Sequence, residues 1–476
     1  MSSLKFGTSG LRGLVEELQG LAAYSYARAF CAMINEDGAT GPEGQVLIGR
    51  DLRSSSPGIA DQCAQGVSDA GLVPIDAGEV PTPALALIAM KMGAPAIMVT
   101  GSHIPDDRNG LKFYRSQGEI DKSDETRIHI WQTRLALTAL PLITAPMKKV
   151  SALAEYRDRY LAFFKPDCLS GMTVGVYQHS SVGRDVIGQV ISALGAEVVP
   201  LGRSDRFVPV DTEALRPEDQ LAVSGWAADR HYDAIVSADG DADRPLIADE
   251  AGQFLRGDLV GALTAVFLGA NTIVTPVTSN SALEGCGRFQ RVVRTKVGSP
   301  FVIAGLAEAR ATRGGVAVGF EANGGTLLGT NVSQGGRFLA ALPTRDAVLP
   351  ILAVLSLKAT SGKPLSLLAA ELGFAVALSN RLHNVPQANS FAFIELLSDQ
   401  DTTCSKSAFE RHGGIVDRDR RDGLRLSLED GSTVHFRASG NAPELRVYVE
   451  ADNLKMAETL LIEGMQFARL WSASSR

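Results

Sequence analysis

Residues 46–75 read VLIGRDLRSSSPGIADQCAQGVSDAGLVPI, and this stretch decides the fold. The apolar run at 46–48 predicts a buried strand, and the serines at 54–56 predict the start of a helix, because their oxygens can accept its free N–H groups. Gly71 suits the left-handed turn that ends a helix, and the apolar residues at 73–75 predict a second strand.

The same order of elements recurs twice, which predicts three related domains. The second copy spans 174–199, with serines at 180–181 and a glycine at 195, and the third, looser copy spans 273–293, with serines at 279 and 281. Short apolar strands that alternate with helices indicate parallel or mixed α/β sheets. We therefore expect three α/β domains whose serine side chains cap the helices.

Residues 365–476 follow a different pattern. Apolar and polar residues alternate at 424–428, 433–437 and 445–450, and an apolar helical stripe runs over 454–473. Antiparallel strands covered by helices on one face predict a small α+β domain.

A chain of 476 residues is too long for one hydrophobic core, since domains usually hold about 100–200 residues. Together with the repeated pattern, this length predicts four domains. We place their limits at 1–147, 148–250, 251–364 and 365–476.

Composition limits the function classes. The chain is 45% hydrophobic and 21% charged, with a net charge of -7, so we expect a globular protein without a nucleic-acid surface. No apolar run reaches the roughly 18–20 residues that cross a bilayer, so we expect no membrane partner. The five cysteines are scattered and form no Cys-x-x-Cys pair, which argues against zinc or disulfides and favours the cytoplasm.

The segment Thr100-Gly101-Ser102-His103-Ile104-Pro105 follows the apolar run 94–99, so we expect the Ser102 hydroxyl at the end of a buried strand. A Gly-x-Ser-x-Gly motif is absent from the segment, which argues against an α/β-hydrolase. His103 either bonds a phosphate or caps the turn. Taken alone, the segment fits a structural turn equally well.

Asp239, Asp241 and Asp243 alternate directly after a predicted strand. Three carboxylates in a tight loop favour a hard cation, Mg²⁺ or Ca²⁺, over a solvated acidic turn. An EF-hand would place Glu250 at its twelfth position but requires glycine at the sixth, where Arg244 stands. Arg244 would neutralise a ligand or hold a phosphate oxygen. A serine nucleophile combined with this loop predicts phosphoryl transfer.

Two further loops carry polar groups. In the segment 319–325, Glu321 and Asn323 could both bond sugar hydroxyls, although a glycine-rich turn is the simpler interpretation of that segment alone. The second loop offers the guanidinium, hydroxyl and backbone N–H groups that hold a phosphate dianion. Its predicted ligands are Arg437, Ser439, Gly440, Asn441 and Arg446.

Together, these segments resemble the α-D-phosphohexomutase family, which includes phosphoglucomutases, phosphomannomutases and phosphoglucosamine mutases. The resemblance covers the whole chain, with the motifs in the family's order. They are Phe6-Gly7-Thr8-Ser9-Gly10-Leu11-Arg12-Gly13, Gly49-Arg50-Asp51 with Arg53-Ser54-Ser55, Thr82-Pro83, Thr100 to Pro105, Asn109-Gly110-Leu111-Lys112, the three aspartates, and the two polar loops.

The resemblance implies four domains around a cleft and a reaction between hexose 1-phosphate and hexose 6-phosphate through a 1,6-bisphosphate. It implies that Ser102 is phosphorylated and binds Mg²⁺ together with Asp239, Asp241 and Asp243. Lys112 becomes the candidate for proton transfer, with Arg12 beside it, and His103 joins the catalytic set. Glu321 and Asn323 fall on the sugar loop. We expect a hexose 1,6-bisphosphate activator, a phosphosugar substrate, and a monomer or weak dimer.

The chain also departs from the family pattern. Ile104 replaces an asparagine, Asn323 a serine, and Asn441-Ala442 a Thr-Glu pair, while Ser299 and Gly325 stand where histidines are common. The form Glu-Ala-Asn-Gly-Gly is similar to bacterial phosphomannomutases of surface-polysaccharide synthesis, so mannose phosphate is the expected substrate. A glucose or dual mutase, a phosphoglucosamine mutase and a non-enzymatic phosphosugar-binding protein are the alternatives.

Overall fold

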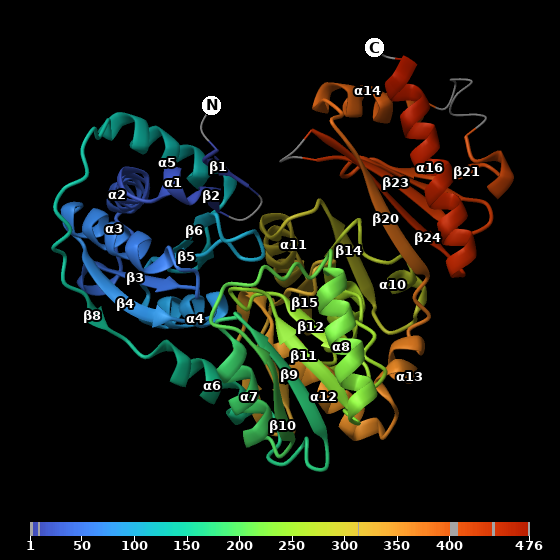
Figure 1. Ribbon diagram of the computed structural model, residues 1–476, viewed down its shortest axis with the longest axis horizontal. Helices are drawn as coiled ribbons and strands as arrows, with labels where there is room; N and C mark the ends of the chain where they lie inside the picture. The colour runs from blue at the N-terminus through green and yellow to red at the C-terminus, as the bar shows by residue number, and fades with distance from the viewer. Residues whose placement is uncertain (1–2, 8–9, 313, 400–407, 440–442, 475–476) are drawn as a thin grey trace. The chain divides into compact units, whose positions relative to one another are not determined.

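The computed structural model describes residues 3–7, 10–312, 314–399, 408–439 and 443–474 (Figure 1). The chain forms two compact units. The first comprises Met1–Ile273 and Gly298–Ala369, and the second comprises Val274–Val297 and Ala370–Arg476.

The first unit begins with a mixed sheet of eight strands in the order β1-β2-β6-β5-β3-β4-β8, with β7 beside β6. Four neighbouring strands run parallel to one another, in the order β5-β3-β4-β8. The remaining pairs are antiparallel: β1 with β2, β2 with β6, β6 with β5 and β6 with β7. Their bounds are β1 Lys5–Phe6, β2 Leu11–Leu14, β3 Gln45–Arg50, β4 Val73–Glu79, β5 Ala96–Val99, β6 Arg108–Arg115, β7 Gly118–Glu119 and β8 Lys148–Lys149.

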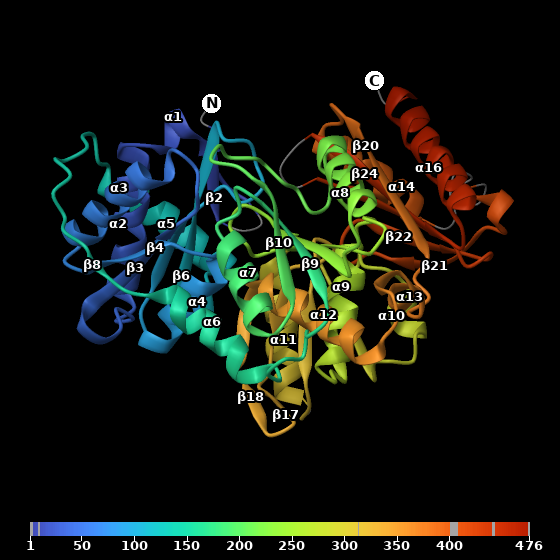
Figure 2. The same ribbon diagram turned by 60° about the horizontal axis from the view of Figure 1, so that its bottom comes forward.

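Helices cover both faces of this sheet (Figures 1 and 2). On one face, α2, α3 and α5 pack together over a core that includes Phe30, Ile48 and Phe113. On the other face, α4 packs against β3 and β5. The bounds are α1 Val15–Leu18, α2 Leu21–Glu36, the 3-10 turn Pro42–Gly44, α3 Ser56–Asp69, α4 Thr82–Met92 and α5 Lys122–Leu135.

A second sheet in the same unit has the order β10-β9-β11-β12. The strands β10, β9 and β11 are parallel, and β12 returns antiparallel to β11. Residues 239–244 connect β11 directly to β12, and we call this segment the acidic loop. The bounds are α6 Ala152–Phe163, β9 Thr173–His179, α7 Arg184–Ala193, β10 Glu197–Arg203, α8 Pro217–Asp229, β11 Ala234–Ala238 and β12 Pro245–Ala248.

The remainder of the first unit contains three antiparallel neighbours, β15, β16 and β19, and the hairpin β17-β18. The helix α11 packs against β15 and β19, and α12 packs against α9. The bounds are α9 Gly257–Phe267, α11 Ser299–Thr312, β15 Ala317–Phe320, β16 Thr326–Leu328, β17 Val332–Gln334, β18 Arg337–Leu339, β19 Leu342–Asp346, α12 Val348–Ser361 and α13 Leu365–Ala370.

The second unit is built on an antiparallel sheet of five strands in the order β20-β24-β23-β22-β21, against which α14 and α16 pack. The three alternating strands and the final helix predicted from the sequence are confirmed. The strand β13 Thr272–Pro276 crosses from the first unit into the second. The other bounds are α10 Ala282–Gly285, β14 Arg291–Thr295, β20 Val376–His383, α14 Gln387–Ser398, the 3-10 turn Glu410–His412, β21 Ile415–Asp419, β22 Leu424–Leu428, β23 Thr433–Ala438, β24 Glu444–Ala451 and α16 Leu454–Ser474.

The predicted glycine stops are confirmed, but the predicted serine caps are wrong. Gly71 and Gly195 have φ of 81° and 100° directly after α3 and α7. No side-chain cap hydrogen bond forms at Ser55 before α3 or at Ser281 before α10. The serine oxygens bond other parts of the fold instead, as where Ser181 Oγ donates to the Asp239 carbonyl at 2.7 Å. Tertiary partners have replaced the local ones.

In the described residues, each helix is too short or too polar to pass through a bilayer.

The contact between α9 and β15 allows a test of core packing. An added Cβ at Gly261 would lie 2.3 Å from Cγ of the buried Phe320 ring. We expect Gly261→Ala to lower the free energy of unfolding by about 1–3 kcal/mol, because overpacking a filled core forces atoms apart. Denaturant titration measures the change.

Gly225 in α8 is the matched control, since an added Cβ there meets nothing within 4 Å. Gly225→Ala should raise the free energy of unfolding by about 0.4–1 kcal/mol, because alanine restricts the unfolded chain. A Gly261→Ala protein as stable as the wild type would contradict the described packing.

Candidate active site

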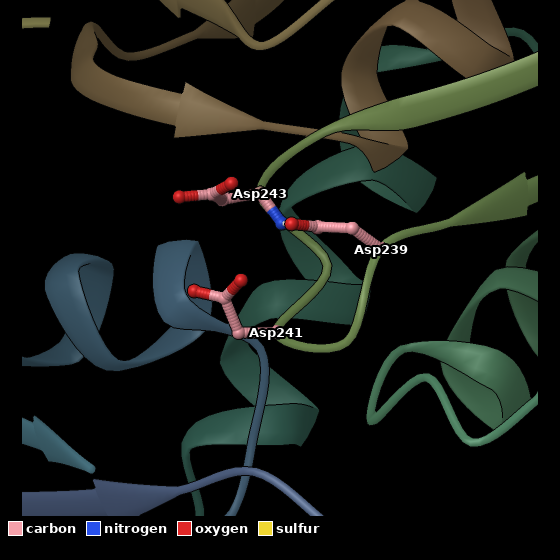
Figure 3. A group of neighbouring side chains, drawn as sticks. All are labelled: Asp239, Asp241 and Asp243. Carbon is pink, nitrogen blue, oxygen red and sulfur yellow. The ribbon is translucent and has the colours of Figure 1, made fainter. Parts of the chain in front are cut away.

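The turn from β11 to β12 presents the three predicted aspartates on one loop (Figure 3). The turn is closed by the Asp239 N–H, which donates to the Arg244 carbonyl at 3.0 Å, and by Asp239 Oδ1, which accepts the backbone N–H groups of Asp243 and Arg244 at 3.2 Å each. Asp239, Asp241 and Asp243 are all buried. One oxygen of each lies within 4.8 Å of the others, which is close enough for all three to bind one cation.

Two buried oxygens of these carboxylates accept no hydrogen bond from the described residues. Lys112 Nζ donates to Asp241 Oδ2 and to Asp243 Oδ2, at 2.6 Å each, and Thr82 also donates to Asp241 Oδ2. Among the described residues, the buried atoms Asp241 Oδ1 and Asp243 Oδ1 have no hydrogen-bond partner. Unpartnered buried carboxylate oxygens fit a hard divalent cation such as Mg²⁺.

The charges within the cluster are unevenly balanced. Burial and the neighbouring charges of Asp241 and Asp243 raise the pKa of Asp239 well above its ordinary value. Burial would also raise the pKa of Asp243, but the cations Arg345 and Lys112 lower it below its ordinary value. Lys112 and Arg345 both contact Asp243 directly, whereas Arg244 Nε is 3.9 Å from Asp239. Positive charge is therefore lacking mainly on the Asp239 side.

Ser102 lies on that side. Its Oγ donates to Asp239 Oδ2 at 2.7 Å, and its side chain is buried. The residue has φ of 56°, in the left-handed region that non-glycine residues seldom adopt. Thr100 Oγ1 accepts the Ser102 N–H at 2.8 Å. The strained backbone thus directs the hydroxyl at the acidic loop.

Arg53 is a residue whose role sequence reasoning missed, because nothing local showed that its guanidinium would hold the serine loop. It donates to the carbonyls of Ser102 at 3.1 Å and of Pro105 at 2.7 Å, and it also bonds Asp51. An added Cβ at Gly101 would lie 2.7 Å from Cζ of Arg53. The loop therefore requires glycine beside Ser102, and Arg53 fixes its shape.

His103 lies next to the serine hydroxyl, with its Nδ1 3.3 Å from Ser102 Oγ. Its Nε2 is 3.9 Å from Asp211 Oδ2. Burial, together with the positive charges of Arg244 and Arg12, lowers the pKa of His103 far below its ordinary value. The imidazole is therefore neutral near pH 7.

Arg12 and Lys112 lie on neighbouring antiparallel strands, β2 and β6. Arg12 pairs with Gly110, and Lys112 follows two residues later, so the two side chains share one face of the sheet. Burial and the charge of Arg244 lower the pKa of Arg12 to about 10. Within the described part of the chain, Arg12 Nη2 is buried without a hydrogen-bond partner. An unpartnered guanidinium of this kind suits an anion.

The Arg244 guanidinium lies at the same cluster without a close contact to it. Its Nε is 3.7 Å from Asp243 Oδ1 and 3.9 Å from Asp239 Oδ2, beyond hydrogen-bond distance. The structure therefore brings together five of the predicted site residues around the aspartates: Ser102, His103, Lys112, Arg12 and Arg244. A sixth, Glu321, is connected to the aspartates by Arg345, which donates hydrogen bonds to both Glu321 and Asp243.

Glu321 and Asn323 occupy the turn between β15 and β16. Asn323 Oδ1 accepts the Gly325 N–H at 2.9 Å, which shapes the turn. Glu321 Oε2 accepts from Arg345 Nη1 at 3.1 Å. The sequence offered no local signal for Arg345, which lies at the end of β19 and also contacts the acidic loop.

The predicted phosphate loop belongs to the second unit. Arg437 on β23 and Arg446 on β24 are directly paired in the sheet register. Arg437 Nε donates to Asp422 Oδ2 at 2.8 Å, and the Ser439 N–H donates to the Glu444 carbonyl at 2.9 Å. The two remaining predicted ligands, Gly440 and Asn441, lie outside the described residues.

Comparison with known families assigns nearly all of this chain. Four phosphoglucomutase/phosphomannomutase family models match in order: alpha/beta/alpha domain I at residues 3–132, domain II at 154–252, domain III at 256–373 and the C-terminal domain at 396–461. The exact domain limits given above stay predictions.

Individual relatives agree with this assignment. A phosphomannomutase of Sinorhizobium fredii is 47% identical over 97% of this chain and 98% of the relative, and one of Salmonella muenchen is 42% identical over 95% and 93%. A putative phosphomannomutase structure from Thermus thermophilus has the same fold, with a TM-score of 0.77, 21% identity and coverage of 98% of this chain and 100% of that one. The chain therefore belongs to the phosphoglucomutase/phosphomannomutase family, whose members are phosphohexomutases.

Proposed function

We propose that this phosphohexomutase interconverts mannose 1-phosphate and mannose 6-phosphate through a phosphorylated Ser102. The observation that carries the proposal is the 2.7 Å contact from Ser102 Oγ to Asp239, within a buried group of three aspartates. The names of the two similar phosphomannomutases support mannose as the sugar.

In the proposed reaction, the free hydroxyl oxygen of the sugar phosphate bonds to the phosphorus carried by Ser102. The bond between phosphorus and Ser102 Oγ breaks, and the hydroxyl proton leaves to a nearby base. The product is a hexose 1,6-bisphosphate. The sugar then turns round, and its other phosphate returns to Ser102. The same bisphosphate, supplied from solution, would act as the activator by phosphorylating an unmodified serine.

Asp239, Asp241 and Asp243 would hold Mg²⁺ together with a phosphate oxygen on Ser102. The bound ion would offset the negative charge that develops on the transferred group. Arg12 and Arg244 would hold the phosphate oxygens, because neither guanidinium is fully used by the carboxylates around it.

Two groups are candidates for proton transfer in this proposal. Lys112 lies between two carboxylates on the sheet face that it shares with Arg12. His103 is 3.3 Å from Ser102 Oγ, but its strongly lowered pKa makes the neutral ring a hydrogen-bonding group and a poor base. We assign proton transfer to Lys112 and a supporting hydrogen bond at the phosphoserine to His103.

Substrate recognition is divided between two loops in this proposal. Glu321 and Asn323 would bond sugar hydroxyls. The second unit would bind the phosphate that is not transferred, through Arg437, Ser439, Gly440, Asn441 and Arg446. Because guanidinium and backbone N–H groups recognise charge, the same loop can accept either end of the sugar.

The substrate is tested by measuring turnover of mannose 1-phosphate and glucose 1-phosphate side by side, with Mg²⁺ and a trace of glucose 1,6-bisphosphate. We expect the mannose compound to give the higher kcat/KM. Equal values would indicate a dual mutase. Turnover of neither, by a folded protein, would contradict the proposed function.

Intact-mass measurement tests the covalent step. Incubation with glucose 1,6-bisphosphate should add one phosphate to the wild type and none to Ser102→Ala, whose mutase activity should fall by roughly a thousandfold or more because the nucleophile is gone. The exposed Ser333 on β17 supplies the control, since Ser333→Ala should keep both the phosphate and the activity. A phosphate that persists in Ser102→Ala would assign the covalent step to another residue.

Removal of divalent ions tests the aspartate cluster. Treatment with EDTA should abolish mutase activity, and Mg²⁺ should restore it. Asp243→Asn should raise the Mg²⁺ concentration for half-maximal activity by at least about tenfold, because one anionic ligand is lost. Asp205→Asn, at an exposed position, should leave that concentration unchanged. Full activity in EDTA would refute a metal-dependent reaction.

A further inference from the structure

Arg345, at the end of β19, connects two loops that are far apart in the sequence. Its Nη2 and Nε donate to Asp243 Oδ2 at 2.8 and 3.1 Å, and its Nη1 donates to Glu321 Oε2 at 3.1 Å. One planar guanidinium thus joins the acidic loop to the loop between β15 and β16. The fork of a guanidinium suits this task, because its N–H groups point in fixed directions.

The surrounding packing leaves Arg345 little freedom. Its side chain is only 3% exposed. An added Cβ at Gly325 would lie 2.6 Å from Cδ of Arg345, so the arginine stem fills the space that a side chain at 325 would need. The two positions are therefore complementary, because the absence of a side chain at Gly325 leaves the space that the Arg345 stem fills.

The residues on either side of Arg345 anchor β19 to other parts of the first unit. Thr344 Oγ1 donates to Glu119 Oε1 on β7 at 3.0 Å. Asp346 accepts hydrogen bonds from the buried hydroxyls of Tyr156 and Tyr160 on α6. The backbone that carries Arg345 is thus fixed on both sides, which lets the guanidinium act as a rigid bridge.

The contacts of Arg345 also determine which oxygen of Asp243 is available. Arg345 and Lys112 both use Oδ2, while Oδ1 is left without a hydrogen-bond partner among the described residues. Burial alone would lower the pKa of Arg345, but Asp243 and Glu321 raise it well above its ordinary value, so the side chain stays charged.

We propose that Arg345 is a positioning residue that holds Glu321 and Asp243 in a fixed relation, so that the sugar hydroxyls and the phosphoryl group are aligned by one side chain. The inference rests on the proposed function, because it takes Glu321 as a sugar ligand and Asp243 as a cation ligand. Arg345 itself does not need to touch the reacting atoms. It acts by orienting one carboxylate that binds the sugar and one that binds the cation.

A double-mutant cycle tests whether Arg345 acts through Glu321. The proteins are the wild type, Glu321→Gln, Arg345→Lys and the double variant, assayed for kcat and KM with mannose 1-phosphate. The second readout is calorimetric binding of mannose 6-phosphate without divalent ion. We expect each single change to lower kcat/KM by about 10–100-fold and to weaken sugar-phosphate binding, as usual for groups that orient ligands. The double variant should lose no more than the worse single variant.

Additional variants separate positioning from simple stability. Arg345→Met should be more impaired than Arg345→Lys, which keeps the charge but loses the fork. Gly325→Ala should impair the wild type and add little further loss to Arg345→Ala, which removes the Cγ and Cδ atoms that the added methyl group would meet. The control is Arg216→Lys, because Arg216 makes a similar two-nitrogen contact to buried Asp219 and should affect only the melting temperature.

The outcomes distinguish the two proposals. Losses that multiply in the Glu321→Gln/Arg345→Lys double variant, or normal kinetics and binding in Arg345→Lys and Arg345→Met, would overturn the positioning role. A wild type that binds mannose 6-phosphate but turns over neither sugar phosphate would overturn the proposed function, and the binding cycle would still test Arg345.

Discussion

Asp243 presents one carboxylate oxygen to two cations, and the candidate site depends on this shared contact. Lys112 Nζ lies 2.6 Å and Arg345 Nη2 lies 2.8 Å from Oδ2. Three buried carboxylates with oxygens within 4.8 Å of one another repel strongly unless positive charge is close. The two cations come from β6 and β19, on either side of the acidic loop in the sequence. Once the acidic loop is buried, it can therefore keep its charge only because β6 and β19 place cations beside it.

Positive charge is distributed unevenly among the three aspartates. Lys112 and Arg345 compensate Asp243, whereas Asp239 keeps a raised pKa because burial and its neighbours disfavour its charged form. Arg244 Nε is 3.9 Å from Asp239, so a divalent ion would supply positive charge that Asp239 lacks, and Asp239 is also the carboxylate that accepts the hydrogen bond from Ser102. The fold places the strongest demand for positive charge next to the serine, and this is where a transferred phosphoryl group would add negative charge.

The structural features that could be predicted from the sequence are those that depend on local residue patterns. The buried strands before Ser102 and Asp239, the glycine stops and the alternating strands of the second unit follow from period and turn chemistry, and all are present. The motifs then indicated the family. The serine caps failed because their oxygens found tertiary partners, and Arg345 was missed because its two carboxylates lie about 20 and 100 residues away in the sequence. A long cationic side chain inside a buried strand gives no local sign of which loops it will join.

The proposed function places a different physical demand on the second unit, because a loop that served either end of a hexose bisphosphate would have to recognise charge without reading the stereochemistry of the sugar. Arg437 and Arg446 occupy paired positions on β23 and β24, so their side chains leave the same face of the sheet. Two guanidinium groups side by side repel, and Asp422, bonded to Arg437 at 2.8 Å, offsets part of that repulsion. A phosphate dianion would offset the remainder, and its nearly symmetric oxygens would accept the same N–H donors whichever carbon carries it. In the proposed function the first unit therefore needs rigidity, supplied by shared ion pairs, whereas the second needs concentrated positive charge.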